Sequence, residues 1–391
     1  MKIKQKPEDF QVHEINEFKP DNAGKFFVYR LTKRGLSTLE CLKILTRKHR
    51  LKNQDMQLCG LKDKHSFSTQ LISSKREIPE DTNNDQFSLE FVGRSNDRVG
   101  ADNHKGNKFI ITVRDLSDSE VEYAQGAIEN VQNYGFVNYF DDQRFGSVKH
   151  GNAFVAKLLI EKKYEEACKV FMSETSSADR SRDRRRRKDI AANWGNFKHL
   201  DEKYGYCEEK PLISHLAKHE KDWVGALLKI NHNLRHILLY AYQSFIWNKT
   251  VSFYLQNKGF AELASDYLLG QLLFFEKIDD ADFSELEKLE VPLIKHNTDI
   301  ENDEIRMIYD NVLAVEGLTI QQFRIRAHHD LYFKEFQREV VILPEELTIV
   351  DAGDDELNEG QKFVTLQFNL PPGVYATILL KRLFKSQKLT S

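Results

Sequence analysis

Strand-like and helix-like segments alternate along this chain without a regular rhythm, and that irregularity limits the folds it can adopt. Residues 87–91 carry apolar side chains at every second position, as expected of a strand with one buried face. Residues 119–134 instead repeat apolar side chains every three or four positions, as a helix does. A doubly wound fold would require a regular succession of parallel strands and helices. We therefore expect an α+β fold with mixed or antiparallel sheets.

The other segments are interpreted by the same periodicities. Ser37 and Glu40 have the spacing of a capping box, which predicts a helix start. Residues 363–380 are uncharged and reach the length of a membrane span, but Pro371, Pro372 and Gly373 interrupt them, so we expect a strand, a turn and a helix there. We expect strands at 26–31, 68–73, 87–91, 108–113, 340–350 and 363–370, and helices at 37–51, 119–134, 153–172, 234–255 and 376–387.

Basic residues are concentrated at the two ends of the chain, although the net charge is only -3. Residues 1–115 hold 22 basic and 16 acidic side chains, residues 361–391 hold five basic and no acidic ones, and the remainder holds 30 basic and 44 acidic ones. If the ends fold together, they form a cationic surface suited to a polyanion. Ordinary solvated charge explains the counts equally well. Seven of the nine residues 180–188 are basic, which is more typical of a solvated helix face or loop than of a dedicated RNA contact.

Several common chemistries lack their motif in this chain. There is no G-x-G dinucleotide fingerprint, Gly-Lys-Ser/Thr phosphate loop, H-E-x-x-H zinc motif or G-x-S-x-G nucleophile elbow. The four cysteines are scattered singly, as reduced cytoplasmic thiols would be. The segment His328-His329-Asp330 has no further ligand at a recognisable spacing. Residues 1–8 lack the apolar stretch of a secretory signal. We expect a cytoplasmic protein that uses no cofactor and no metal.

One turn carries a candidate catalytic group. Asp63 lies between Lys62 and Lys64 just before an expected strand, and flanking cations favour the charged carboxylate, which can act as a nucleophile or base. An ordinary polar turn would have the same composition. Asn107 and Phe109, two residues apart, share one face of the strand that they open, where core packing explains Phe109 equally well.

Five separated motifs follow one another along the chain: Lys4-x-x-Pro7-Glu8-Asp9-Phe10-x-Val12-x-Glu14, Gly60-Leu61-Lys62-Asp63-Lys64-His65, Gly106-Asn107-x-Phe109, Asn138-Tyr139-Phe140-Asp141-Asp142-Gln143-Arg144-Phe145-Gly146 and Leu370-Pro371-Pro372-Gly373-Val374-Tyr375-Ala376-Thr377. With these motifs the sequence resembles the TruD family of tRNA pseudouridine synthases. Five motifs in the family's order, over nearly the whole chain, are far more specific than any one alone. The departures are Lys64 and residues 66–68 around Asp63, and Lys381-Arg382 where the family is expected to have Arg-Glu.

The resemblance implies a pseudouridine synthase catalytic domain built from residues 1–137 and 344–391, with an inserted α/β TruD-specific domain at 138–343. It implies isomerisation of a flipped-out uridine, at position thirteen of tRNA, without a cofactor. It implies tRNA as the partner, with no membrane and no protein partner.

The resemblance also assigns the site. Asp63 would be the catalytic nucleophile or base, Phe10 and Phe109 would form the platform for the base, and Asn107 would orient the aspartate loop or the base. Two alternatives stay open: an RNA-binding or RNA-chaperone protein of the same fold without catalysis, and a metal-dependent nuclease that uses aspartates with His328 and His329. The remaining substrate-binding positions implied by the family are Lys4, Glu14, Lys62 and Tyr375.

Overall fold

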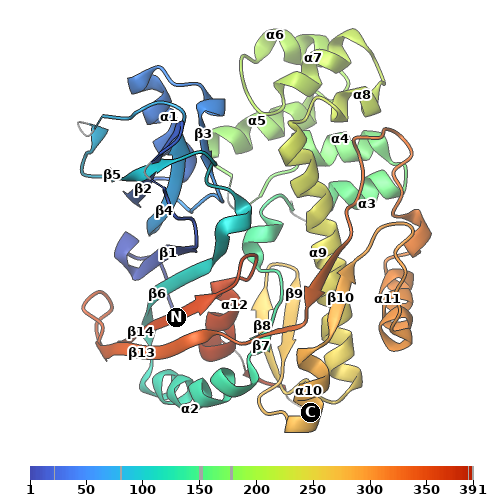
Figure 1. Ribbon diagram of the computed structural model, residues 1–391. Helices are drawn as coiled ribbons and strands as arrows, with labels where there is room; N and C mark the ends of the chain where they lie inside the picture. The colour runs from blue at the N-terminus through green and yellow to red at the C-terminus, as the bar shows by residue number, and fades with distance from the viewer. Residues whose placement is uncertain (22, 80–81, 149–152, 177–178, 386, 390–391) are drawn as a thin grey trace. The chain divides into compact units, whose positions relative to one another are not determined.

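The chain forms two compact units in the computed structural model, which describes residues 1–21, 23–79, 82–148, 153–176, 179–385 and 387–389 (Figure 1). The first unit comprises Met1–Phe136 and Ile342–Lys385, and the second comprises Val137–Val341 and Ser386–Ser391. The chain passes from the first unit to the second after Phe136 and returns to the first at Ile342. The C-terminus differs from expectation, because β15 (Gln387–Lys388) pairs with a strand of the second unit.

An eight-stranded mixed sheet, built from both ends of the chain, organises the first unit. Its order is β13-β14-β6-β1-β4-β2-β5, with β3 paired to β4. Strands β1 and β4 are parallel, and every other neighbouring pair is antiparallel. The expected α+β class with a mixed sheet is therefore confirmed. The strands are β1 (Phe10–Asn16), β2 (Phe26–Arg34), β3 (Met56–Leu58), β4 (Phe67–Ser74), β5 (Phe87–Ser95), β6 (His104–Leu116), β13 (Glu345–Asp354) and β14 (Lys362–Leu370).

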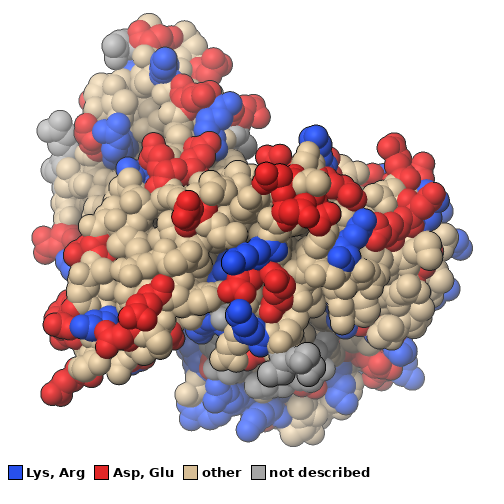
Figure 2. Space-filling view, turned by 90° about the horizontal axis from the view of Figure 1, so that it is seen from below, with Lys and Arg blue, Asp and Glu red and all other residues tan. Residues whose placement is uncertain are grey.

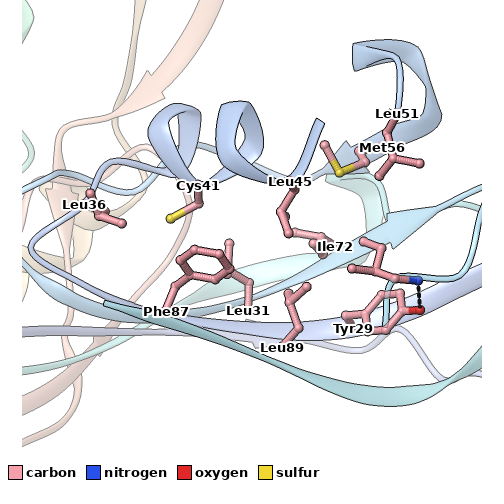
Figure 3. Close-up of a cluster of buried hydrophobic side chains, with 11 residues drawn as sticks. Tyr29, Leu31, Leu36, Cys41, Leu45, Leu51, Met56, Ile72, Phe87 and Leu89 are labelled. Carbon is pink, nitrogen blue, oxygen red and sulfur yellow. Dashed lines mark hydrogen bonds between the residues drawn. The ribbon is translucent and has the colours of Figure 1, made fainter. Parts of the chain in front are cut away.

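Helix α1 (Thr38–His49) covers part of this sheet and closes a hydrophobic core. The predicted capping box is present, since Ser37 accepts from the backbone of Glu40 and the Glu40 carboxylate accepts from the backbone of Ser37. Figure 3 shows Cys41 and Leu45 pointing from α1 toward the strands. The same unit contains α2 (Asp118–Tyr134) and α12 (Ala376–Leu380), which continues as a π-helical turn, Lys381–Lys385. The helix expected at 376–387 therefore ends earlier.

Helices dominate the second unit, as the periodicity predicts. The longest, α9 (His232–Asn257), buries Tyr242, Trp247 and Tyr254. The single helix expected at 153–172 is wrong: the chain forms two helices there, because Lys162 adopts a left-handed φ of 61° between them. The helices are α3 (Val155–Ile160), α4 (Tyr164–Ser173), α5 (Ser181–Ala192), α6 (Phe197–Lys203), α7 (Lys210–Lys218), α8 (Trp223–Leu227), α9, α10 (Asp280–Glu287) and α11 (Asp303–Val315).

The sheets of the second unit are small. The β15-β8-β9 and β10-β11 pairings are antiparallel, so these strands do not form the parallel sheet of an α/β domain. A short connection between β8 and β9 explains this, since parallel neighbours need a long crossover. A further pair, β7 with β12, lies where the chain passes between the units. The strands are β7 (Phe136–Val137), β8 (Leu263–Tyr267), β9 (Gly270–Phe274), β10 (Glu290–Leu293), β11 (Phe336–Glu339) and β12 (Val341–Ile342).

Residues 363–380 form β14, a turn and the start of α12, as the proline pair predicts. In the described ranges of the chain, no helix combines the length and the apolar character needed to cross a membrane.

The division into units changes the interpretation of charge. The first unit holds 26 basic and 27 acidic residues, because residues 116–136 add four acidic side chains and residues 342–385 add seven acidic and four basic ones to the 22 and 16 of residues 1–115. Figure 2, the view from below Figure 1, shows both acidic and basic side chains gathered in clusters. The basic excess at the chain ends is therefore offset within the unit, and any cationic surface must be local.

Candidate active site

The register of the central strands brings distant motifs to one face of the sheet. Glu14 of β1 lies opposite Asn107 of β6, and Val12 lies opposite Phe109. Directly opposed residues of antiparallel strands project to the same face, and alternate residues of one strand share it. Glu14, Asn107, Phe109 and Phe10 therefore lie on a common face, as the first and third motifs require.

Strands β4 and β2 extend this face to Lys33, a residue that the motifs did not indicate. Val12 pairs with Ser68, and Ser68 pairs with Lys33. The Lys33 side chain is 1% exposed, and its Nζ donates to the backbone carbonyl of Asp63 at 2.5 Å. Burial lowers the pKa of Lys33 from 10.5 to about 8. A lysine at an inward position of an alternating apolar strand is the signal that would have identified it.

The turn that carries Asp63 is held by several hydrogen bonds. The Asp63 carbonyl accepts from Ser66 Oγ at 2.9 Å as well as from Lys33. The backbone N–H of Lys62 donates to Thr38 Oγ1, and Gln70 Nε2 donates to the carbonyl of Gly60, each at 2.9 Å. These contacts fix the backbone of the turn and present the Asp63 carboxylate, which is 41% exposed.

Lys4 pairs with the Asp63 carboxylate. Its Nζ lies 3.1 Å from Asp63 Oδ2 and 4.2 Å from the centre of the Phe10 ring. The flanking lysines were expected to provide the neighbouring charge, but Lys62 bonds Asn107 and Lys64 bonds Glu40. Lys4 also has a φ of 62°, which is strained for a non-glycine residue. Such strain is characteristic of functional positions.

Lys62, Asn107 and Glu14 form a polar group beneath the turn. Lys62 Nζ lies 2.5 Å from Asn107 Oδ1 and 4.0 Å from Glu14 Oε2. The Glu14 side chain is 1% exposed, and its Oε1 accepts from the backbone N–H of Leu71 at 3.2 Å. Burial lowers the pKa of Lys62, and the Glu14 carboxylate opposes that effect. Asn107 therefore contacts the aspartate turn at the side chain of Lys62.

Phe109 is packed between two other rings. It is 7% exposed, its ring is stacked on Phe368 at a centroid distance of 5.4 Å, and it meets the edge of Phe10 at 6.2 Å. Phe10, which is also buried, carries the Lys4 ammonium over its ring. The three rings thus connect the core of the sheet to the ion pair at Asp63.

The closing motif approaches the same end of β6. Leu370, the last residue of β14, lies opposite Asn107. A Cβ on Gly106 would lie 2.4 Å from the carbonyl oxygen of Leu370, so only glycine permits this close approach. Tyr375 follows as the residue that precedes α12 and is partly buried. The third and fifth motifs are therefore spatial neighbours through their backbones.

Two other sequence features belong to the second unit. His328, His329 and Asp330 are the candidate metal group, since one ligand atom of each lies within 4.8 Å of the others. In the basic run, Arg187 is buried and pairs with Glu208 at 2.9 Å and with the buried Glu209 at 3.2 Å. The run, which spans the start of α5, is therefore partly an internal ion-pair network rather than a wholly solvated face.

Comparison with known proteins gives consistent matches over the full length. Residues 1–383 match the protein family described as tRNA pseudouridine synthase D (TruD). The chain is 31% identical over 394 residues to "Probable tRNA pseudouridine synthase D 1" of Methanococcus maripaludis, covering 98% of this chain and 99% of the relative. It is 29% identical over 394 residues to "tRNA pseudouridine synthase D" of Aquifex aeolicus, covering 99% and 98%. A crystal structure of the putative tRNA pseudouridine synthase D from Methanosarcina mazei superposes with a TM-score of 0.73 at 26% identity, covering 98% of this chain and 93% of that one.

Proposed function

This chain belongs to the TruD family and is a tRNA pseudouridine synthase, an isomerase; we propose that Asp63 is its catalytic carboxylate and that its target is the uridine at position thirteen of tRNA. The observation that carries the proposal is the carboxylate itself. It is partly exposed, ion-paired with Lys4 at 3.1 Å, and mounted on a turn whose backbone is fixed from below by Lys33.

The reaction breaks the N1–C1′ bond of uridine and forms a C5–C1′ bond, while N1 gains a proton and C5 loses one. Asp63 either attacks C1′ as a nucleophile or removes the 2′ proton to form a glycal. Both routes require the charged carboxylate. The Lys4 ammonium lies 3.1 Å from Asp63 Oδ2, and its contact with Phe10 holds it beside the carboxylate.

The buried groups beneath the turn act by positioning. Lys33 fixes the Asp63 carbonyl, while Lys62 links the turn to Asn107 and Glu14. Catalytic geometry must be held within a fraction of an ångström, which flexible surface side chains do not achieve. In this proposal Asn107, Glu14 and Lys62 support the carboxylate rather than contact the base.

The uridine must leave its stack before it can react, and aromatic contact replaces the lost stacking. We assign this role to Phe10 and Phe109, which are 6% and 7% exposed, with Tyr375 contributing from the start of α12. The first unit then acts as the catalytic domain and the second as the TruD-specific domain of a cytoplasmic enzyme that uses no cofactor and needs no protein partner.

The test is Asp63→Asn assayed on unmodified tRNA with carbodiimide primer extension, in parallel reactions with and without excess EDTA. The amide keeps the shape of the side chain but cannot act as nucleophile or base. We expect isomerisation to be abolished while tRNA affinity changes by less than about tenfold, or ~1.4 kcal/mol.

The matched control is Asp97→Asn, which removes an exposed carboxylate from the same unit. It should retain wild-type activity. Substantial turnover by Asp63→Asn would remove Asp63 from the mechanism. Strand scission abolished by EDTA would support a nuclease, and binding without isomerisation by the wild type would support a non-catalytic RNA-binding protein.

A further inference from the structure

A cavity of about 480 Å³ lies within the second unit, in the segment that follows α11. Most of its wall comes from residues 323–333, and His296 completes it. Two arginines, Arg324 and Arg326, and two histidines, His328 and His329, line it together with Tyr332. None of the lining residues is a carboxylate. Asp330, which is not among the lining residues, lies 3.3 Å from His329 Nε2 and 3.9 Å from His328 Nδ1, so the cationic character of the cavity rests on its two arginines.

The two arginines differ from their neighbours in having no partner. Arg235 pairs with Asp330, and Arg306 of α11 pairs with Asp303. Arg324 and Arg326, by contrast, form neither a hydrogen bond nor an ion pair with any residue that the structure describes, and both are exposed. A guanidinium presents forked donors that match the oxygens of a phosphate. Two unpaired guanidiniums in one cavity indicate an anionic ligand.

A metal ion fits this cavity less well than an anion does, although His328, His329 and Asp330 place ligand atoms near one another. The Asp330 carboxylate is paired with the buried Arg235 at 3.4 Å, and the backbone N–H of Asp330 donates to His328 Nδ1 at 3.1 Å. A divalent cation would have to displace both contacts. It would also lie in a cavity lined by two unneutralised guanidiniums, which repel it.

Tyr332 adds a second recognition element. It is 41% exposed, and its ring meets His236 edge to face at a centroid distance of 5.2 Å, which fixes its orientation. Exposed aromatic rings beside unpaired cations are the means by which proteins bind single-stranded nucleic acid, through base stacking and phosphate contact. The cavity volume lies in the range of small-molecule sites, and exceeds what a phosphate alone requires.

We propose that this cavity binds one nucleotide of the tRNA substrate, with its phosphate between Arg324 and Arg326 and its base on Tyr332. This rests on the proposed function for the identity of the RNA, but the contact lies wholly in the second unit. A free mononucleotide carries the same chemistry, so the experiment must separate the two sources.

The test compares Arg324→Gln/Arg326→Gln with Arg182→Gln/Arg185→Gln, a matched control that removes two exposed arginines of the same unit from the basic run. Dissociation constants for unmodified tRNA are measured by fluorescence anisotropy over a range of salt. The cavity variant should bind tRNA more weakly than the control does. Its plot of log affinity against log salt should be less steep than that of the wild type by about one to two. Tyr332→Ala should weaken binding roughly 5- to 150-fold without that change in slope.

Single-turnover isomerisation should be unchanged in the Arg182→Gln/Arg185→Gln control, because it alters neither the Asp63 turn nor the cavity. If wild-type protein fails to isomerise tRNA, the proposed function fails while the binding comparison can still be interpreted. Equal losses of tRNA affinity in the cavity and control variants would overturn the proposed site. It would also be overturned if the cavity variant lost UMP binding but kept the tRNA affinity of the wild type. Saturable Zn²⁺ binding abolished by His329→Ala would overturn it in favour of a metal.

Discussion

Replacing Phe109 by alanine separates the structural from the functional contribution of its ring. The ring is 7% exposed, stacked on Phe368 and in edge contact with Phe10, so truncation leaves a cavity. A buried phenylalanine changed to alanine costs about 3–5 kcal/mol of unfolding free energy. For a unit of this size, that corresponds to a fall in melting temperature of about 6–20 °C. We also expect activity per folded molecule to fall, because the same ring flanks Phe10 beside the Lys4–Asp63 ion pair.

Phe368→Ala is the matched control, because it removes the other ring of the stacked pair from the same face of the sheet. It should cost similar stability but retain activity per folded molecule. The measurements are thermal melting and single-turnover rates corrected for the folded fraction. A melting temperature for Phe109→Ala within about 2 °C of wild type would refute the packing argument. Equal activities per folded molecule for the two variants would remove Phe109 from the base platform.

Three further outcomes follow from the site. Lys4→Met should lower single-turnover activity about tenfold or more. The free energy of unfolding, measured by urea titration, should change by less than about 1 kcal/mol because the ion pair is partly exposed. Wild-type activity in this variant would exclude a role for the ion pair. Because burial lowers the pKa of Lys33 from 10.5 to about 8, the unfolded chain holds more protons between these values, and unfolding free energy should rise with pH there by up to about 3 kcal/mol. Lys33→Met should lose this rise, and an identical pH profile by urea titration would contradict the assignment. Affinity for tRNA should fall steeply with salt despite the balanced charge of the first unit, and a nearly flat plot of log affinity against log salt would mean that the basic chain ends do not share an RNA surface.

Local features could be predicted from the sequence where their cause is local. The capping box of Ser37 and Glu40, and the interruption at Pro371, depend on residues a few positions apart. The break at Lys162 was missed because neither glycine nor proline marks it, and the left-handed residue is a lysine. Periodicity averages over such a position and predicts one continuous helix.

The site was predicted less completely because its contacts are set by strand register. Lys4 reaches Asp63 across 59 positions of sequence, whereas the neighbouring Lys62 and Lys64 point to other partners. Lys33 contributes from a strand that carries no recognised motif. Adjacent charges in a sequence therefore say little about which cation lies beside a carboxylate once a turn is folded.

The position of β14 between β13 and β6 has a consequence for biosynthesis. During translation β6 can pair with β1, but its other edge stays unpaired until residues 362–370 leave the ribosome. At about 5–20 residues per second, synthesis of residues 117–361 takes roughly 12–50 s. An open strand edge is a site of aggregation, and Lys108 and Arg114 supply charges that discourage it. The nascent chain therefore carries Asp63, the proposed catalytic residue, on an incomplete sheet until β14 has been synthesised.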